Sequence, residues 1–380
     1  MKRFNFFIKS FFSFILFPSL AFSWNISLKS FSQKIEKQTP SWIEEGIDRD
    51  MSYFQNGFSS SEITLCLEKL NTMPGIELAG LVRIHFINGQ LNFEPLKSLS
   101  SEQSQSLEGF LSALYLLNSI WPLPPLDFIL TLNPSFDRPF LLNETFVPIF
   151  AVSKEKHNHK VLLVPRLWNP EREMLLTSLS YSSCYDWNSK IEKALWRGSA
   201  TDGRYGFYNW DCLPRARLAF HSCHHGDSLD ARLISTKILD YSLTQEIEKF
   251  NLFAPFLFPQ EQSAYKYLIS IDGKASPSSF EWQLFSHSLV FKNDSNRIEW
   301  FYEALKPQEH FISFNMIPND LIDKISWART HDSEAKSMAE KAYHFAESHL
   351  LDEEAFVYLY KLLIAYAELL NIKNENRKNF

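Results

Sequence analysis

The chain has 380 residues, more than one hydrophobic core usually organises, so we expect two domains. Hydrophobic residues make up 45% of the chain, with 34 Phe and 10 Trp for the cores, and 22% charged residues keep the surface soluble. The formal net charge is −6 and Lys and Arg do not cluster, which argues against a nucleic-acid partner.

The first 23 residues have the pattern of a secretory signal peptide. Met1-Lys2-Arg3 is a charged start, an apolar run follows from Phe11 to Phe22, and small residues precede Trp24. The run is short for a membrane span, so we expect cleavage after Ser23. The mature protein is then exported, periplasmic or secreted, with no stable membrane span. An uncleaved membrane anchor that starts at Phe4 is the alternative.

The following part alternates helices with apolar strands. Helices are expected from Trp42 to Phe54, after Ser59, where Glu62 completes a capping box, and from Ser100 to Leu117. Asn88-Gly89 predicts a hairpin between two strands. Further strands are expected at Leu126–Leu132, Pro148–Val152 and Val161–Val164. This alternation implies an α/β domain over residues 24–185, with a sheet covered on both faces.

The stretch from Tyr265 to Lys292 is the most informative part of the chain. Tyr265 to Ile271 alternates like a buried strand and stops at Asp272-Gly273. Ser278 and Glu281 predict a capping box at a helix start, and Ser288 to Phe291 returns as a second strand. Because the first turn of such a βαβ unit presents free N–H groups to an anion, residues 186–330 are expected to form a nucleotide-binding domain.

The C-terminal end is expected to be helical. Ala335, Met338, Ala342 and Ala346 fall on one helical face, and Phe356 to Leu370 is a further apolar helix. We expect residues 331–372 to pack back across the domains. Residues 373–380 form a polar tail.

Besides 265–273 and 288–292, several other pieces of the chain form a recognisable series. They are Phe150 to Lys154, Val164-Pro165 with Trp168, Trp196-Arg197-Gly198-Ser199, Pro214-Arg215, Glu299-Trp300-Phe301-Tyr302, and the run from His331 to Leu350. Their order and spacing resemble those of glycosyltransferase family 90, which includes the protein O-glucosyltransferase Rumi, bacterial lipopolysaccharide-modifying enzymes and fungal capsule enzymes.

The resemblance implies a fold and an activity. The fold is GT-B, an α/β architecture in which two Rossmann-like domains face each other across a cleft. The activity is an inverting, metal-independent transfer of a sugar, glucose or xylose, from a UDP-sugar to a hydroxyl of a protein or glycan acceptor such as lipopolysaccharide. No cofactor and no metal are expected besides the UDP-sugar co-substrate.

Asp137 is the expected catalytic base. It follows the strand Leu126–Leu132 and matches the Asp of an Asp-aromatic-Pro element that supplies the base in the family, with Arg138 in place of the aromatic residue. The alternative is an exposed loop carboxylate that hydrogen-bonds its own turn.

The expected donor-binding residues come from three segments. An Arg fork pairs two phosphate oxygens, which makes Arg197 the leading diphosphate ligand. Gly198 lets the backbone approach, and further contacts are expected from Ser199, Thr201, Arg215, Asp272, Gly273, Ser278 and Ser279.

Ser279 is also a departure from the family. It stands where members commonly have an arginine that grips the diphosphate, so a contact worth about 1.5–3 kcal/mol is missing. Another cation, such as Lys274, is one way to compensate. The departure also leaves open a catalytically inactive member that acts as a sugar-binding or interaction protein.

Other clusters of polar residues favour structural interpretations. Cys212 and Cys223 are the first choice for a disulfide bridge, with free buried thiols as the alternative. Asp48-Arg49-Asp50 lies in an expected helix, which favours a solvated charged face over a metal site. The potential ligands between His221 and Asp227 lie too close together for a closed tetrahedral site, so a polar loop is favoured.

Overall fold

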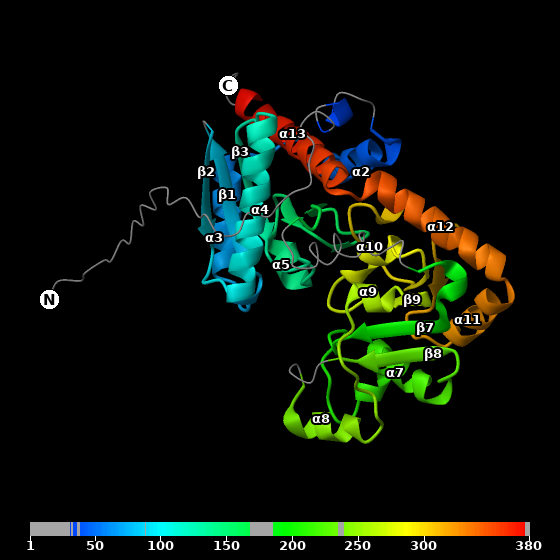
Figure 1. Cartoon of the computed structure of the whole chain (residues 1–380). Coiled ribbons are helices and arrows are strands. Elements are labelled where there is room, and N and C mark those ends of the chain that lie inside the picture. Colours follow the sequence, from blue (N-terminus) through cyan, green and yellow to red (C-terminus); the bar gives the residue numbers. More distant parts are fainter. Residues whose placement is uncertain are drawn as a thin grey trace.

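The computed structural model describes residues 31, 33–35, 39–87, 89–167, 185–234 and 239–376 (Figure 1). The predicted signal peptide, Trp168 and Cys184 lie outside the described residues. None of the described helices combines the length and the apolar character that a membrane crossing requires.

The first described sheet is mixed. Its strand order is β2-β1-β3-β4-β6, in which β1 is antiparallel to β2 and β3, while β3, β4 and β6 are parallel. The β1–β2 hairpin closes through the pair Ile87 and Gln90, which confirms the turn predicted there. The strands are β1 (Leu81–Ile87), β2 (Gln90–Pro95), β3 (Leu126–Thr131), β4 (Ile149–Ala151) and β6 (Val161–Leu163).

Helices with local start signals accompany this sheet. Ser59 with Glu62 and Ser100 with Gln103 both form capping boxes, so the helices α3 and α4 begin where their sequences predict. The helical elements of this part are α2 (Ser41–Ser52), α3 (Ser60–Asn71), η1 (Ile76–Leu78), α4 (Ser101–Ile120) and α5 (Pro139–Glu144).

The solvated face predicted for Asp48-Arg49-Asp50 is wrong at Asp50. Its side chain is buried and pairs at 2.7 Å with Lys154, which is itself buried. Lys154 Nζ also donates to the Val161 carbonyl at 3.0 Å. A charge on a helix is taken out of water when an oppositely charged partner from another element meets it, and helical periodicity does not reveal such a partner.

The second described sheet is parallel throughout. Its order is β12-β10-β9-β7-β8, the doubly wound order 2-1-3-4-5 when the strands are counted along the chain. The βαβ unit predicted from Tyr265 to Phe291 is confirmed as β9, α10 and β10. The strands are β7 (Ile191–Gly198), β8 (Leu229–Leu233), β9 (Tyr265–Ser270), β10 (Leu289–Asn293) and β12 (Ile312–Phe314).

Short helices surround the second sheet. Helices stand between successive strands of the parallel order, as crossover connections require, while η3 precedes β7 and α11 follows β12. They are η3 (Trp187–Ser189), η4 (Trp210–Cys212), α7 (Pro214–His224), α8 (Tyr241–Glu248), α9 (Pro259–Gln262), α10 (Ser279–Leu284), η5 (Tyr302–Ala304) and α11 (Leu321–Thr330).

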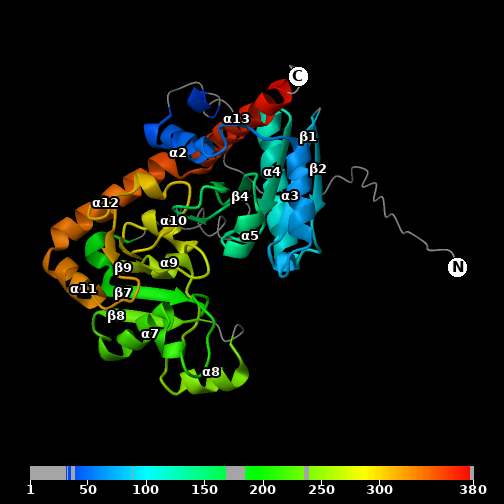
Figure 2. The same cartoon turned by 180° about the vertical axis from the view of Figure 1, so that it is seen from behind.

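Two structures join the sheets. The strands β5 (Lys154–Glu155) and β11 (Arg297–Ile298) pair antiparallel, one from each half of the chain. The helices α12 (Asp332–His349) and α13 (Asp352–Asn376) run one after the other from the second sheet to the first, as both views show (Figures 1 and 2). Accordingly, α12 contacts α10, α11 and β10, whereas α13 contacts α2 and β3.

The fold class is therefore confirmed as α/β with two Rossmann-like domains, of which the first has a mixed sheet because of the β1–β2 hairpin. The limits predicted for the domains, 24–185 and 186–330, stay a prediction. One apolar core contains Phe128 of the first sheet, Leu268 of the second and Phe356 of α13, so the packing runs continuously from one half to the other.

The predicted Cys212–Cys223 bridge is wrong, because the three cysteines that the structure describes, which include Cys66, are free thiols. Cys212 ends η4, and Cys223 lies near the far end of α7. The intervening helix rises roughly 1.5 Å per residue, which holds the two thiols apart. A bridge requires their Cα atoms within about 7 Å.

Candidate functional site

A pocket of about 450 Å³ lies at the carboxyl ends of β7 and β9. These two strands are neighbours at the point where the parallel order reverses, which is where ligands bind in doubly wound sheets. Pro134 and Arg166 of the first half of the chain also line it. The lining contains eight of the predicted donor-site residues, namely Arg197, Gly198, Ser199, Thr201, Arg215, Gly273, Ser278 and Ser279.

Arg197 lines the pocket and is paired. Its Nη1 and Nη2 donate to the two carboxylate oxygens of Asp230 on β8, at 3.0 and 2.8 Å. Nη1 also donates to the carbonyls of Trp196 and Asp230. The Nε atom is buried and has no hydrogen-bond partner among the described residues. The guanidinium is thus held in a fixed orientation, and its Nε–H has no recorded acceptor.

Arg215 is a buried clamp between two pocket loops. From the first turn of α7 it donates to the carbonyls of Ile271 and Asp272, and to the carbonyl of Ser199 and the Thr201 hydroxyl, at 2.8 to 2.9 Å. Burial lowers the pKa of this guanidinium. These contacts tie the turn after β9 to the loop after β7, so Arg215 builds the pocket wall through the backbone.

Gly273 is required by this clamp. A Cβ atom there would lie 2.5 Å from the Thr201 Oγ1 and 2.9 Å from Nη2 of Arg215. Both contacts are closer than real Cβ atoms make, and Arg215 is held by hydrogen bonds on both sides. The glycine of the predicted Asp-Gly turn therefore lets the two loops approach each other.

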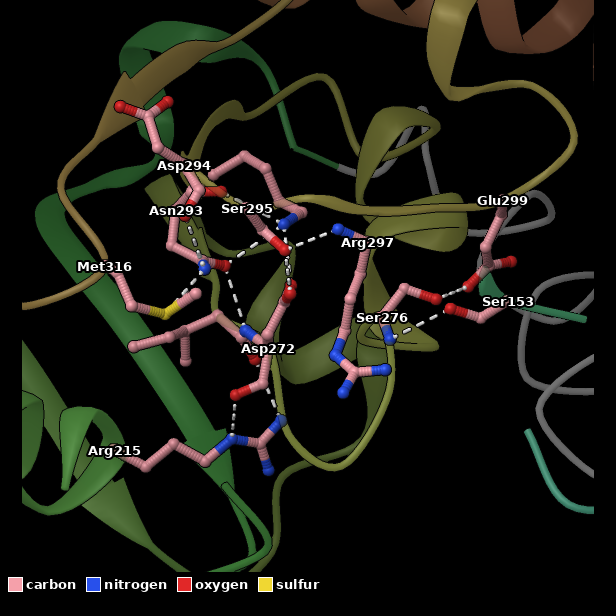
Figure 3. Close-up of polar contacts among 12 residues, drawn as sticks. Ser153, Arg215, Asp272, Ser276, Asn293, Asp294, Ser295, Arg297, Glu299 and Met316 are labelled. Atoms are coloured by element: carbon pink, nitrogen blue, oxygen red, sulfur yellow. Dashed lines mark hydrogen bonds and ion pairs between the residues drawn. The ribbon is translucent and has the colours of Figure 1, made fainter. Parts of the chain in front are cut away.

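Asp272 does not line the pocket, unlike the other predicted residues of this turn. Its side chain is buried in a polar network, where Lys292 Nζ lies 2.8 Å from Oδ1 and the Ser295 hydroxyl donates to Oδ2 (Figure 3). Its backbone N–H donates to the Asn293 amide oxygen at 2.9 Å. The carboxylate thus anchors the turn to the end of β10.

Ser278, Ser279 and Lys274 form the remaining wall. The helix α10 begins at Ser279, and Ser278 stands at the N-cap, although its side chain makes no capping hydrogen bond, so the capping box predicted there with Glu281 is wrong. Lys274 lies in the loop between Gly273 and α10, lines the pocket and is exposed. Of the other lining cations among the described residues, Arg166 and Arg197 pair with carboxylates, and Arg215 donates to carbonyls and a hydroxyl, whereas no such contact is recorded for Lys274.

Asp137 lies outside the pocket lining, three residues beyond Pro134, which does line it. Its Oδ2 accepts hydrogen bonds from Nη1 of Arg297 at 2.5 Å and from the Ser135 hydroxyl at 3.3 Å. The Ser135 contact fits the alternative of a loop carboxylate bonded within its own turn. The ion pair with Arg297, from the other half of the chain, had no signal in the local sequence.

The sequence analysis also missed the ion pair of Arg166 and Glu299. Arg166 Nη2 lies 2.9 Å from Glu299 Oε1, and both side chains are buried. Ser276 joins them, because its hydroxyl donates to Glu299 Oε1 at 2.5 Å. Arg166 directly follows the motif Val164-Pro165, and Glu299 is the first residue of the motif Glu299-Trp300. The sequence therefore indicated both segments but did not show that these two side chains contact each other.

No group of three or more metal-ligating side chains is present within the described residues. The polar loop predicted from His221 to Asp227 is wrong as far as His224, because α7 continues to that residue. The rings of His221 and His225 stack at 6.4 Å, and burial lowers the pKa of His221. His224 Nδ1 lies 3.2 Å from the Phe220 carbonyl within α7.

The profile described as Glycosyl transferase family 90 matches residues 164–380. The chain therefore belongs to this family of glycosyltransferases. The matched region begins just before Arg166 and contains every predicted donor-site residue.

Curated relatives carry the names of individual enzymes. Protein O-glucosyltransferase 2 of Danio rerio is 37% identical over 185 residues, which is 48% of this chain and 34% of the relative. The human Protein O-glucosyltransferase 3 is 31% identical over 202 residues, 53% of this chain and 37% of the relative. Protein O-glucosyltransferase 1 of Rattus norvegicus is 24% identical over 284 residues, which is 70% of this chain and 68% of the relative. The chain thus spans about a third of the length of the first two relatives.

The similar solved structures are distant in sequence. HepE of Anabaena in complex with UDP-glucose has a TM-score of 0.38 and 11% identity, covering 61% of this chain and 65% of that chain. A glycosyltransferase from Rickettsia africae has a TM-score of 0.36 and 14% identity, also covering 61% and 65%. The family assignment follows from the sequence match over residues 164–380.

Proposed function

We propose that this protein is an inverting, metal-independent glycosyltransferase that moves a sugar, glucose or xylose, from a UDP-sugar to a hydroxyl of a protein or glycan acceptor. The observation that carries the proposal is the position of the pocket. It lies at the switch point of the parallel sheet and is lined by arginine, lysine, serine and glycine residues. A sugar diphosphate requires such cations, hydroxyls and N–H groups.

The diphosphate contacts come from the pocket residues that still have donors. Within the part of the chain that the structure describes, Nε of Arg197 is buried without a hydrogen-bond partner, and no hydrogen bond or ion pair is recorded for the Lys274 ammonium. Ser199 and Ser279, each with a hydroxyl, also line the pocket. In the transfer these groups stabilise the negative charge that develops on the departing UDP.

The remaining role is that of a base. Asp137 accepts the proton of the acceptor hydroxyl as that oxygen bonds to the anomeric carbon, and the bond from this carbon to the diphosphate breaks with its electron pair leaving on UDP. Attack on the face opposite the leaving group inverts the configuration. Both hydrogen bonds recorded for the Asp137 carboxylate go to Oδ2, so Oδ1 is the oxygen that takes the proton.

A donor screen tests this function. The purified protein is incubated with a panel of UDP-sugars, including UDP-glucose and UDP-xylose, and released UDP is measured with and without EDTA. We expect release from one or a few donors, unchanged by EDTA. Asp137→Asn should reduce transfer by about 10²-fold or more while UDP affinity stays nearly unchanged. The matched control is Asp323→Asn, at an exposed position on α11.

The second candidate is a sugar-binding or interaction protein without catalytic activity. Ser279 in place of the family arginine favours it, as do the protein partners that Arg166, Arg197 and Arg215 already have. This candidate predicts that every donor stays intact, and a degenerate donor cleft should give no rise of the melting temperature with UDP. Release of UDP from a donor would show that this second candidate is wrong.

A further inference from the structure

Three consecutive residues after β10 cross from the second half of the chain to the first. Arg297 pairs with Asp137, Ile298 pairs through its backbone with Lys154, and Glu299 pairs with Arg166. In the two ion pairs, Glu299 is 133 positions from Arg166 in the sequence, and Arg297 is 160 positions from Asp137. The segment 297–299 is therefore the place where the candidate base and the donor domain are joined directly.

The same segment is fastened to the turn that walls the pocket. The Ser295 hydroxyl donates to Oδ2 of Asp272 and accepts the backbone N–H of Arg297 at 2.9 Å. Figure 3 shows Ser295 between Asp272 and Arg297. Lys292 holds the other oxygen of Asp272. Hydrogen bonds thus run without interruption from the turn after β9 to the backbone of Arg297.

The Arg297 side chain then reaches Asp137 and engages one of its two oxygens. Nη1 contacts Oδ2, and within the described residues no hydrogen bond is recorded for Oδ1. Both side chains of this pair are about one-fifth exposed, at 22% and 21%, whereas Asp272 and Lys292 are almost fully buried at 4% and 6%. The pair of Asp272 and Lys292 is therefore a buried anchor. The Arg297 guanidinium, which is connected to it, orients the Asp137 carboxylate, which solvent can reach.

We infer that Arg297 is a positioning residue for Asp137, and that Ser295 holds Arg297 in a fixed position relative to the pocket turn after β9. The inference rests on the proposed function, in which Asp137 is the base. Arg297 does not touch the substrate. It fixes the carboxylate through Oδ2 so that Oδ1 faces the acceptor hydroxyl at a constant distance from the bound donor. Misplacement of a reacting group by about 1 Å costs up to 10²-fold in rate.

The test compares Arg297→Ala with Arg297→Lys on the donor that the wild-type enzyme uses. We expect Arg297→Ala to lower kcat by about tenfold to a hundredfold, with KM for the UDP-sugar and the affinity for UDP nearly unchanged. Arg297→Lys keeps a cation and should recover part of the loss. Ser295→Ala should lower kcat in the same manner but less. The control is Arg329→Ala, whose partner Glu192 lies near the start of β7, at the opposite end from the pocket.

A double variant separates positioning from general stability. In the Asp137→Asn background, Arg297→Ala should reduce the residual activity no further, because the two residues act as one unit. Equal kcat for wild type and Arg297→Ala overturns the inference while the proposed function stands. A further loss in the Asp137→Asn background, or parallel losses of UDP affinity and kcat, also overturns it. Wild-type protein that uses no donor overturns the proposed function, and the inference with it.

Discussion

Arg197 and Asp230 form a two-pronged ion pair across the parallel strands β7 and β8, with N–O distances of 3.0 and 2.8 Å. The arginine expected to bind the donor is therefore held by a carboxylate of its own chain. Its side chain is 8% exposed and that of Asp230 is 27% exposed. The pair orients the guanidinium, and Nε has no hydrogen-bond partner among the described residues.

Arg197→Ala is expected to weaken UDP binding by about 1.5–3 kcal/mol, the value of a hydrogen bond to a charged group, as measured by calorimetric titration. The single variant also leaves Asp230 unpaired near the pocket. The double variant Arg197→Ala with Asp230→Ala also removes the charge of Asp230, and it should still bind UDP weakly. If the double variant binds UDP like the wild type, Arg197 only neutralises Asp230 and is no donor ligand.

Ser279→Arg is expected to strengthen UDP binding about tenfold, or about 1.4 kcal/mol, because it restores a guanidinium to the pocket wall. The gain should shrink with added salt, which screens part of the attraction. Lys274→Ala should weaken binding in the native background and enlarge the gain from Ser279→Arg, since both cations serve the same anion. Ser326→Arg, at an exposed position on α11, is the control. No gain in either background would mean that Ser279 does not face the diphosphate.

Gly273→Ala and Gly46→Ala should have effects of opposite sign. The added Cβ at Gly273 meets Thr201 and Arg215, so we expect a loss of about 1–3 kcal/mol in the free energy of unfolding and weaker UDP binding. At Gly46, within α2, the nearest atom is 3.7 Å away, and alanine should stabilise by about 0.5–1 kcal/mol. Urea unfolding measures both. If Gly273→Ala leaves the free energy of unfolding unchanged, the side chains of Thr201 and Arg215 can move to make room for the added Cβ.

Lys190 makes stability depend on pH. Its ammonium is buried and donates to the carbonyls of Ser263 and Ser286 and to the Ser288 hydroxyl. Burial lowers the pKa of Lys190 from 10.5 to about 8. Above pH 8 the unfolded chain retains this proton while the native chain releases it, so the contribution of Lys190 to the free energy of unfolding rises with pH up to about 10.

The comparison with Lys190→Met isolates this contribution. The difference in the free energy of unfolding between wild type and variant should increase from pH 7.5 to pH 9.5, as measured by urea unfolding. Lys249→Met is the control, because the Lys249 side chain is 66% exposed. A difference that falls with pH would contradict the direction assigned to Lys190.

Local sequence predicted the elements that carry their own start and stop signals. The capping box of Ser59 and Glu62 marks α3, and the Asp272-Gly273 stop marks the end of β9 within one residue. The pocket followed from these predictions, because the carboxyl ends of neighbouring parallel strands meet at one edge of a sheet. Arg197, Ser199, Gly273 and Ser279 are accordingly brought together.

Tertiary structure alone decided which of these groups are free to bind. The sequence predicted Asp272 as a pocket residue, but its carboxylate binds Lys292 and Ser295 in a buried network. Arg215 was also predicted to bind the donor, but its guanidinium donates to backbone carbonyls. Asp137 meets Arg297 across 160 positions of sequence. Periodicity and capping report on neighbours within a few residues, whereas a buried charge takes its partner from whichever element the packing brings against it, so only the folded chain determines the pair.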